Sequence, residues 1–251
     1  MEVAEHIAAI RRDGPLLRAA AGSAGLNAAV PSCPGWTVRD LVRHLGGVHR
    51  WATSIVATPR TEPWRVDLEE VVGSWPEDSR LLDWFDDGCQ ALAAALEQAS
   101  PDLNCWTFLR APSPLAMWAR RQAHETAMHR VDVELAAGAR VTQFTAPFAA
   151  DGIDELLTCF ITRSSSPLRA DEPRTLGVRC SDAADNWLVT IGPDAARTTP
   201  IGTDTPDCTL SGRAADIYLA LWSRPEQAAR AIEGDESVLD LFLDKVHVRW
   251  T

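Results

Sequence analysis

The chain has 251 residues, of which 46% are hydrophobic, so it is long enough for one large domain or two modest domains with a packed core. Its formal net charge of −11 argues against nucleic-acid binding, because a nucleic-acid site needs a basic surface. No apolar run reaches the roughly 18 residues that a membrane span requires, and the acidic start lacks a signal-peptide pattern. The six cysteines show no C-x-x-C spacing and are expected to be reduced thiols in a cytoplasmic protein.

The first half of the chain has the apolar spacing of helices. Four helices are predicted, at about 3–22, 37–57, 79–99 and 113–138, with mostly loop and a short helical turn at 58–78. Asp13-Gly14-Pro15 is expected to interrupt or kink the first helix. Thr37 with Asp40 marks the start of the second helix, and Ser113 with Pro114 marks the start of the fourth. Helices of this length predict a four-helix bundle over residues 1–140.

After Pro147 the pattern changes to short strands between turn residues. A helix is predicted at 151–161, strands at 175–180, 187–191 and 207–211, helices at 213–223 and 236–245, and a possible last strand at 246–250. This arrangement predicts a small α+β domain over residues 150–251, joined to the bundle by residues 139–150. The fold class is therefore mainly α.

The fourth helix carries the most informative strip of side chains. Glu125 and His129 are one turn apart, and Asp132 follows on the same strip. A carboxylate and an imidazole at this spacing are two ligands for a cation such as Zn²⁺, so a third ligand must come from elsewhere. His124 and His129 are about 140° apart, which excludes the zinc-protease arrangement. The alternative is a solvated strip in which Arg121 pairs with Glu125.

The second helix offers two histidines as the third ligand. His44 and His49 flank its apolar stripe about 140° apart, so either can reach inward but both cannot reach one ion. A single histidine beside a core stripe is also commonly structural. Bundles build metal sites from side chains on facing helices, so one of these histidines is expected to meet Glu125 and His129.

Several stretches together resemble the mycothiol-dependent maleylpyruvate isomerases. They are Cys33-Pro34-Gly35-Trp36 with the residues up to Leu45, the strip from Arg121 to Asp132, the stretch from Leu210 to Arg224, and Gly234-Asp235. The resemblance covers nearly the whole chain. It implies a DinB-like four-helix bundle with a small C-terminal domain.

The resemblance also implies site residues. A divalent metal, most simply Zn²⁺, would be held by His44, Glu125 and His129, and a pocket arginine would be Arg224, with Arg213 as the fallback. Arg224 would clamp a substrate carboxylate, or it would cap the end of its own helix. The partners implied are mycothiol and a small electrophilic or carboxylate substrate, with the chain a monomer or homodimer.

Two imidazoles and one carboxylate leave a coordination position open, where a bound thiol would become a nucleophilic thiolate. Asp132 is placed to accept the second ring N–H of His129, or it pairs with Arg121 or Arg130. No cysteine lies beside the strip in the sequence, so no protein nucleophile is expected. The predicted function is a metal- and mycothiol-dependent isomerase or S-transferase. The alternatives are a non-catalytic metal-binding or ligand-sensing module and a metal-free scaffold.

Overall fold

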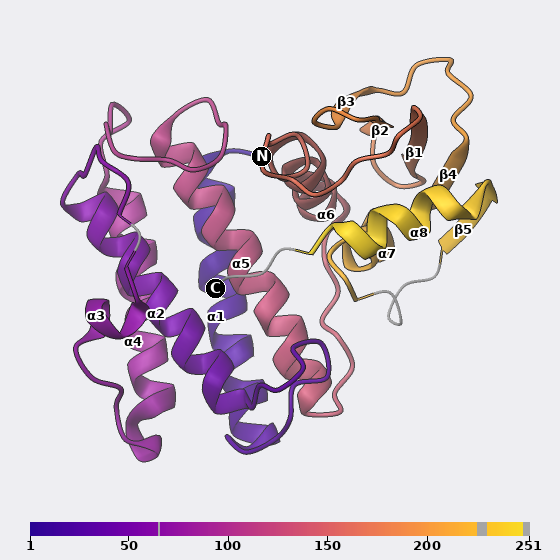
Figure 1. Ribbon diagram of the computed structural model, residues 1–251. Coiled ribbons are helices and arrows are strands. Elements are labelled where there is room, and N and C mark those ends of the chain that lie inside the picture. The colour runs from indigo at the N-terminus through magenta and orange to yellow at the C-terminus, as the bar shows by residue number, and fades with distance from the viewer. Residues whose placement is uncertain (65, 225–229, 248–251) are drawn as a thin grey trace. The chain divides into compact units, whose positions relative to one another are not determined.

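The computed structural model describes residues 1–64, 66–224 and 230–247, which belong to two compact units, Met1–Thr142 and Gln143–Thr251. The first unit is helical and the second combines helices with one sheet (Figure 1). The predicted class, a mainly α protein with a four-helix bundle before a small α+β part, is confirmed. Among the described helices, none is both long and apolar enough to cross a bilayer.

The first unit is built from four long helices that lie side by side in Figure 1. They are α1 (Val3–Ala24), α2 (Val38–Ala57), α4 (Asp78–Gln98) and α5 (Pro114–Ala136), with a short α3 (Leu68–Val72) in the expected loop. The helices α1 and α2 each pack against both α4 and α5. One face of α5 therefore meets α2, which is where the expected ligands would have to converge.

The local sequence sets the starts of α2 and α5 as predicted. The Thr37 side chain accepts the Asp40 amide, and the Asp40 carboxylate in turn accepts the Thr37 amide at 2.8 Å. Ser113 Oγ accepts the amide of Ala116 at 3.2 Å, and Pro114 occupies the first helical position. These caps satisfy amide groups that have no partner inside the helix.

Of the two expectations for Asp13-Gly14-Pro15, an interruption or a kink, the interruption is wrong, because α1 runs through these residues as one helix. Pro15 removes one backbone hydrogen bond, but tertiary contacts outweigh that loss. Asp13 is fully buried and its Oδ1 lies 3.1 Å from Nε of Arg130 on α5. Gly14 lies so close to Cys89 of α4 that an added Cβ would be 2.4 Å from its Sγ atom. These contacts hold the segment helical.

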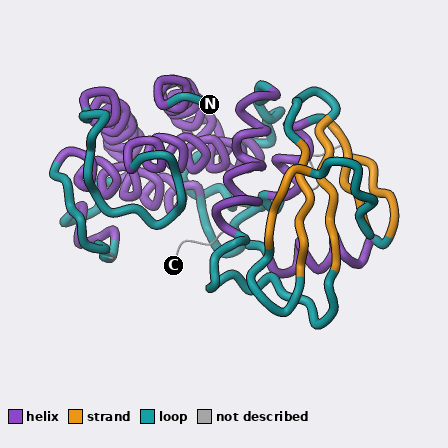
Figure 2. The backbone as a smooth tube through the Cα atoms, turned by 90° about the horizontal axis from the view of Figure 1, so that it is seen from above, coloured by secondary structure: helices purple, strands orange, loops and turns teal. Residues whose placement is uncertain are grey.

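The second unit contains one sheet, shown as a single layer in Figure 2. Within the described residues its strands are β1 (Arg174–Cys180), β2 (Asn186–Ile191), β3 (Arg197–Pro200), β4 (Cys208–Gly212) and β5 (Arg230–Gly234). The order is β3-β2-β1-β4-β5, and only the β1–β4 pair is parallel. The helical segments are α6 (Ala146–Asp154), the π-helix η1 (Glu155–Phe160), α7 (Ala214–Leu221) and α8 (Glu236–Lys245).

Three details of the second unit differ from the prediction. The strands β3 and β5 were not predicted, because they lie at the sheet edges and are largely exposed, without the apolar alternation of a core strand. The helix predicted from Asp151 already begins at Ala146 and continues as the π-helix. Of the possible strand at 246–250, Val246 and His247 form no strand, and 248–250 lie outside the described residues.

Candidate metal centre

The strip on α5 is buried, so the interpretation of a solvated strip is wrong. Glu125 is 3% exposed and His129 is 8% exposed, because α5 lies between α1 and α2. The pair expected in that alternative does form, with Arg121 Nη2 donating to Glu125 Oε2 at 3.2 Å. It is a buried ion pair, however, and not a surface pair. One carboxylate oxygen of Glu125 is therefore used by Arg121.

The other carboxylate oxygen faces two histidines. Glu125 Oε1 lies 3.6 Å from Nε2 of His44 and 3.3 Å from Nε2 of His129, and one ligand atom of each residue lies within 4.8 Å of the others. Ligand atoms around a tetrahedral Zn²⁺ at its usual bond lengths are about 3.3 Å apart. Within the described residues, Nε2 of His44 has no hydrogen-bond partner. The three side chains therefore fit a divalent metal by donor type, by spacing and by this buried nitrogen.

His49, the other candidate on α2, has a different environment. It is fully buried, and its Nε2 lies 3.0 Å from Oγ1 of Thr126. It is not a member of the cluster formed by His44, Glu125 and His129. Burial lowers the pKa of His49 to about 3, so the ring is neutral in the folded protein. Of the two histidines on α2, His44 therefore lies beside Glu125, and His49 is packed in the core against Thr126.

Asp132 lies beside the Nδ1 edge of the His129 ring. Its Oδ2 is 3.0 Å from Nδ1 of His129, so Nδ1–H can donate to the carboxylate, and Nε2 faces Glu125 and offers a lone pair there once it has lost its proton. Arg130, a partner considered for Asp132, pairs with Asp13 and Glu134. The hydrogen bond between Asp132 and His129 orients the imidazole ring in the way that a metal-ligating histidine needs.

The charges of the cluster favour an ionised Glu125. Burial alone would raise the pKa of Glu125, but His129, His44 and the charge of Arg121 hold this pKa well below its usual range. Burial is also the main cause that lowers the pKa of His44. Burial opposes protonation of His129 as well, yet Asp132 and Glu125 raise its pKa to about 9. This raised pKa favours a protonated His129 at neutral pH, so His129 and Arg121 both place positive charge beside Glu125.

A loop that the sequence did not connect with the strip also reaches it. Ser32 Oγ donates to Asp132 Oδ1 at 2.5 Å, and Cys33 Sγ lies 3.7 Å from Asp132 Oδ2. The ring of Trp36 lies edge-on to His44, with 5.1 Å between centroids. Cys33 is half-buried whereas the other five cysteines are buried, and all six are free thiols. No local pattern links residues 32–36 to residue 132, so only the fold reveals these contacts.

The two candidate arginines belong to the second unit. The Arg224 guanidinium donates to the carbonyl of Trp222 at the end of α7, as in the capping alternative. Arg213 precedes α7, and its Nε lies 3.5 Å from Oδ2 of Asp182. Which arginine, if either, binds a substrate stays a prediction.

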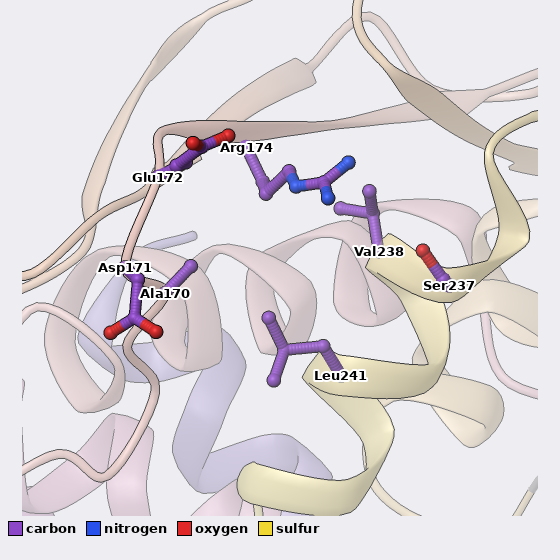
Figure 3. A pocket seen from close by; sticks show the side chains of 7 residues that line it. All are labelled: Ala170, Asp171, Glu172, Arg174, Ser237, Val238 and Leu241. Atoms are coloured by element: carbon purple, nitrogen blue, oxygen red, sulfur yellow. The ribbon is translucent and has the colours of Figure 1, made fainter.

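The second unit also has a groove of about 410 Å³ beside the start of α8 (Figure 3). Neither Arg224 nor Arg213 lines it. It is lined by Ala170, Asp171, Glu172, Arg174, Ser237, Val238 and Leu241. Arg174 Nη1 donates to Asp235 Oδ2 at 3.1 Å, and both side chains are partly exposed.

The fold and the site together define a class of protein. It is a helical bundle with a candidate metal centre of two histidines and one glutamate between two helices, followed by a separate α+β unit. The comparisons with known proteins agree with this class. Residues 7–134 match the mycothiol maleylpyruvate isomerase N-terminal domain, and residues 147–241 match the MDMPI C-terminal domain. The chain therefore belongs to the mycothiol maleylpyruvate isomerase family.

Solved structures show the same fold. A structure of the mycothiol-dependent maleylpyruvate isomerase is 15% identical, with a TM-score of 0.62. A histidine-to-alanine mutant of the mycothiol-dependent maleylpyruvate isomerase is 14% identical, with a TM-score of 0.63. Each comparison covers 92% of this chain and 93% of the other. At this identity the likeness shows the shared fold alone. No curated protein matches the chain.

Proposed function

We propose that this chain is a metal-dependent enzyme that uses mycothiol, a low-molecular-weight thiol, as cosubstrate. The reaction is an isomerisation of the maleylpyruvate type or the transfer of the thiol to a small electrophile. The observation that carries the proposal is the approach of His44, Glu125 and His129, with Oε1 of Glu125 only 3.3 and 3.6 Å from the two imidazole nitrogens. Membership of the family supports the choice of thiol.

Two imidazoles and one carboxylate favour Zn²⁺, and they leave a position where the bound ion would stabilise the cosubstrate thiol as a thiolate. The residues of the chain prepare this position. Asp132 accepts Nδ1–H of His129 and so directs Nε2 of that ring toward Glu125. Arg121 pairs with Oε2 of Glu125, which leaves the other oxygen facing the histidines, and together with His129 and His44 it lowers the pKa of this carboxyl.

For the carboxylate of a substrate, Arg224 is the proposed partner, and Arg213 is the alternative. A guanidinium has five N–H donors in a planar fork, so a bond to the carbonyl of Trp222 is compatible with a bidentate contact to a carboxylate. Replacing Arg224 by methionine is expected to raise the KM for a carboxylate substrate more than it lowers kcat, because the contact would act mainly in binding.

The decisive experiment measures mycothiol-dependent turnover of maleylpyruvate and of a panel of small electrophiles. His129→Ala is expected to reduce turnover to the background rate of thiol and substrate alone. His247→Ala is the matched control, because His247 is an exposed histidine of the second unit. Unchanged turnover in His129→Ala would contradict the proposal. Bound metal without turnover in the wild-type protein would favour a non-catalytic metal-binding module.

A further inference from the structure

Residues 31–37, which we term the site loop, lie between α1 and α2, and they contact His44 directly and His129 through Asp132. Trp36 lies edge-on to His44. Ser32 reaches His129 indirectly, because its hydroxyl donates to Oδ1 of Asp132 at 2.5 Å, while Oδ2 of the same carboxylate lies 3.0 Å from Nδ1 of His129. Two successive hydrogen bonds therefore connect the loop with Nδ1 of His129, a candidate metal ligand.

The site loop is held in one conformation by its own backbone. The Val30 amide donates to the Trp36 carbonyl at 2.9 Å, and the Trp36 amide donates to the Cys33 carbonyl at 3.0 Å. Gly35 has a φ of +87°, which a residue with a side chain rarely adopts. This backbone places Ser32 beside α5, where the hydrogen bond to Asp132 Oδ1 orients its hydroxyl. The loop thus offers a preorganised donor to α5.

Asp132 needs such a donor. It is fully buried, and a buried carboxylate is costly unless its oxygens accept hydrogen bonds. His129 supplies one donor for Oδ2, and Ser32 supplies one for Oδ1. Cys33 is also near Oδ2, at 3.7 Å, but a thiol is a weak donor. With both oxygens engaged, rotation of the carboxylate about its terminal torsion would break a hydrogen bond on each side.

We propose that Ser32 is a positioning residue for the metal centre, acting through Asp132 on the orientation of the His129 ring. This inference rests on the proposed function, since it assigns a role within the same site. Ser32 does not touch the metal position itself. It orients the carboxylate of Asp132, and this carboxylate orients the imidazole of His129. Nε2 of His129 therefore stays directed toward Glu125 and His44.

The test is the Zn²⁺ affinity of the purified full-length protein, measured by competition with a chromophoric chelator at fixed pH. Partners in the outer shell of a metal site typically change affinity by 10–100-fold, so Ser32→Ala is expected to weaken Zn²⁺ binding roughly tenfold. Ser32→Thr keeps the hydroxyl and is expected to restore the affinity. Ser54→Ala is the matched control, since Ser54 Oγ donates to the Trp51 carbonyl at the far end of α2.

A double-mutant cycle distinguishes action through Asp132 from a general effect on the fold. In an Asp132→Ala background, Ser32→Ala is expected to cause no further loss of affinity, because the intermediate group is absent. Ser32→Cys, which has nearly the same shape and a weaker donor, replaces Ser32→Ala if that variant does not fold, with a loss in the same direction. Circular dichroism confirms that each variant is folded.

The outcomes separate this inference from the proposed function. If the wild-type protein does not bind Zn²⁺, the proposed function fails and this inference fails with it. If the wild-type protein binds Zn²⁺ and folded Ser32→Ala binds it equally well, only the role of Ser32 is overturned. Equal losses in the wild-type and Asp132→Ala backgrounds would also overturn it, because Ser32 would then act by another route.

Discussion

Arg121 and Glu125 form a buried ion pair one turn apart on α5, in which Nη2 of Arg121 lies 3.2 Å from Oε2 of Glu125. The same carboxylate turns its other oxygen to His44 and His129. Glu125 thus connects a fixed cation of the protein with the position proposed for a metal. The stability of the bundle and the occupancy of the site should therefore be coupled.

Replacing Arg121 by methionine tests this coupling. The variant leaves Glu125 buried without its guanidinium, and removing one partner of a buried pair typically costs about 3 kcal/mol or more of unfolding free energy. Urea denaturation in the presence of a chelator should show this loss in full. Added Zn²⁺ should reduce the loss, because the ion would supply positive charge to Glu125. The same loss with and without Zn²⁺ would contradict the coupling.

A second buried arginine should matter for stability alone. Arg130 joins α5 to α1, since its Nε lies 3.1 Å from Asp13 and its Nη1 lies 2.6 Å from Glu134. Arg130→Met is expected to lower the unfolding free energy by about 4 kcal/mol, as for other broken buried pairs. Arg11→Met removes an exposed pair with Glu97 and should change the unfolding free energy far less, because solvent screens that pair. Chemical denaturation of both variants measures the two losses of unfolding free energy. Equal losses would contradict the greater contribution expected of the buried pair.

His49 should make the bundle sensitive to acid. Its pKa is lowered from 6.5 to about 3 by burial, so between these values the unfolded chain binds a proton that the folded protein does not. The stability that depends on neutral His49 is present above pH 6.5 and is lost as the pH falls toward 3.

His49→Gln removes this titration and keeps a side chain that can bond Thr126. The plots of unfolding free energy against pH for wild type and variant should therefore diverge by roughly 1.4 kcal/mol per pH unit inside this window. Parallel plots between pH 6 and pH 4, both inside the window that the pKa of His49 defines, would show that His49 does not titrate differently in the two states.

Gly14 should be intolerant of alanine although it lies inside a helix. Alanine usually stabilises a helix interior by about 0.5–1 kcal/mol over glycine. Here the added Cβ would be 2.4 Å from Sγ of Cys89, so Gly14→Ala is expected to destabilise the fold by about 1–3 kcal/mol through overpacking. Adding Cys89→Ala removes the clashing atom and should recover most of the loss in thermal unfolding. A Gly14→Ala protein more stable than wild type would contradict the close packing of α1 and α4.

The sequence identified much of the bundle because local signals set it. Thr37 and Ser113 cap their helices as predicted, and the spacing of Glu125 and His129 already placed both on one strip. The choice between His44 and His49 came only from the family resemblance, since both flank the same apolar stripe. In the structure His44 lies beside Glu125, and His49 lies against Thr126.

Other features required the fold. A hydrophobic pattern does not predict the burial of α5, because many of its buried residues are polar or charged. These residues pair with one another, as Arg130 does with Glu134. The contact between Ser32 and Asp132 joins residues one hundred positions apart. The helix through Pro15 is held by tertiary contacts that local propensity does not contain. Long-range polar contacts of this kind carry no periodic signal.

The most direct measurement of the central claim is the metal content of the purified full-length protein by elemental analysis. If His44, Glu125 and His129 form one catalytic-type site, the wild-type chain and His247→Ala should each retain about one divalent ion per chain. Replacing any of the three proposed ligands by alanine should remove that ion. A wild-type chain that takes up no divalent ion, or full metal content in all three alanine variants, would contradict the account.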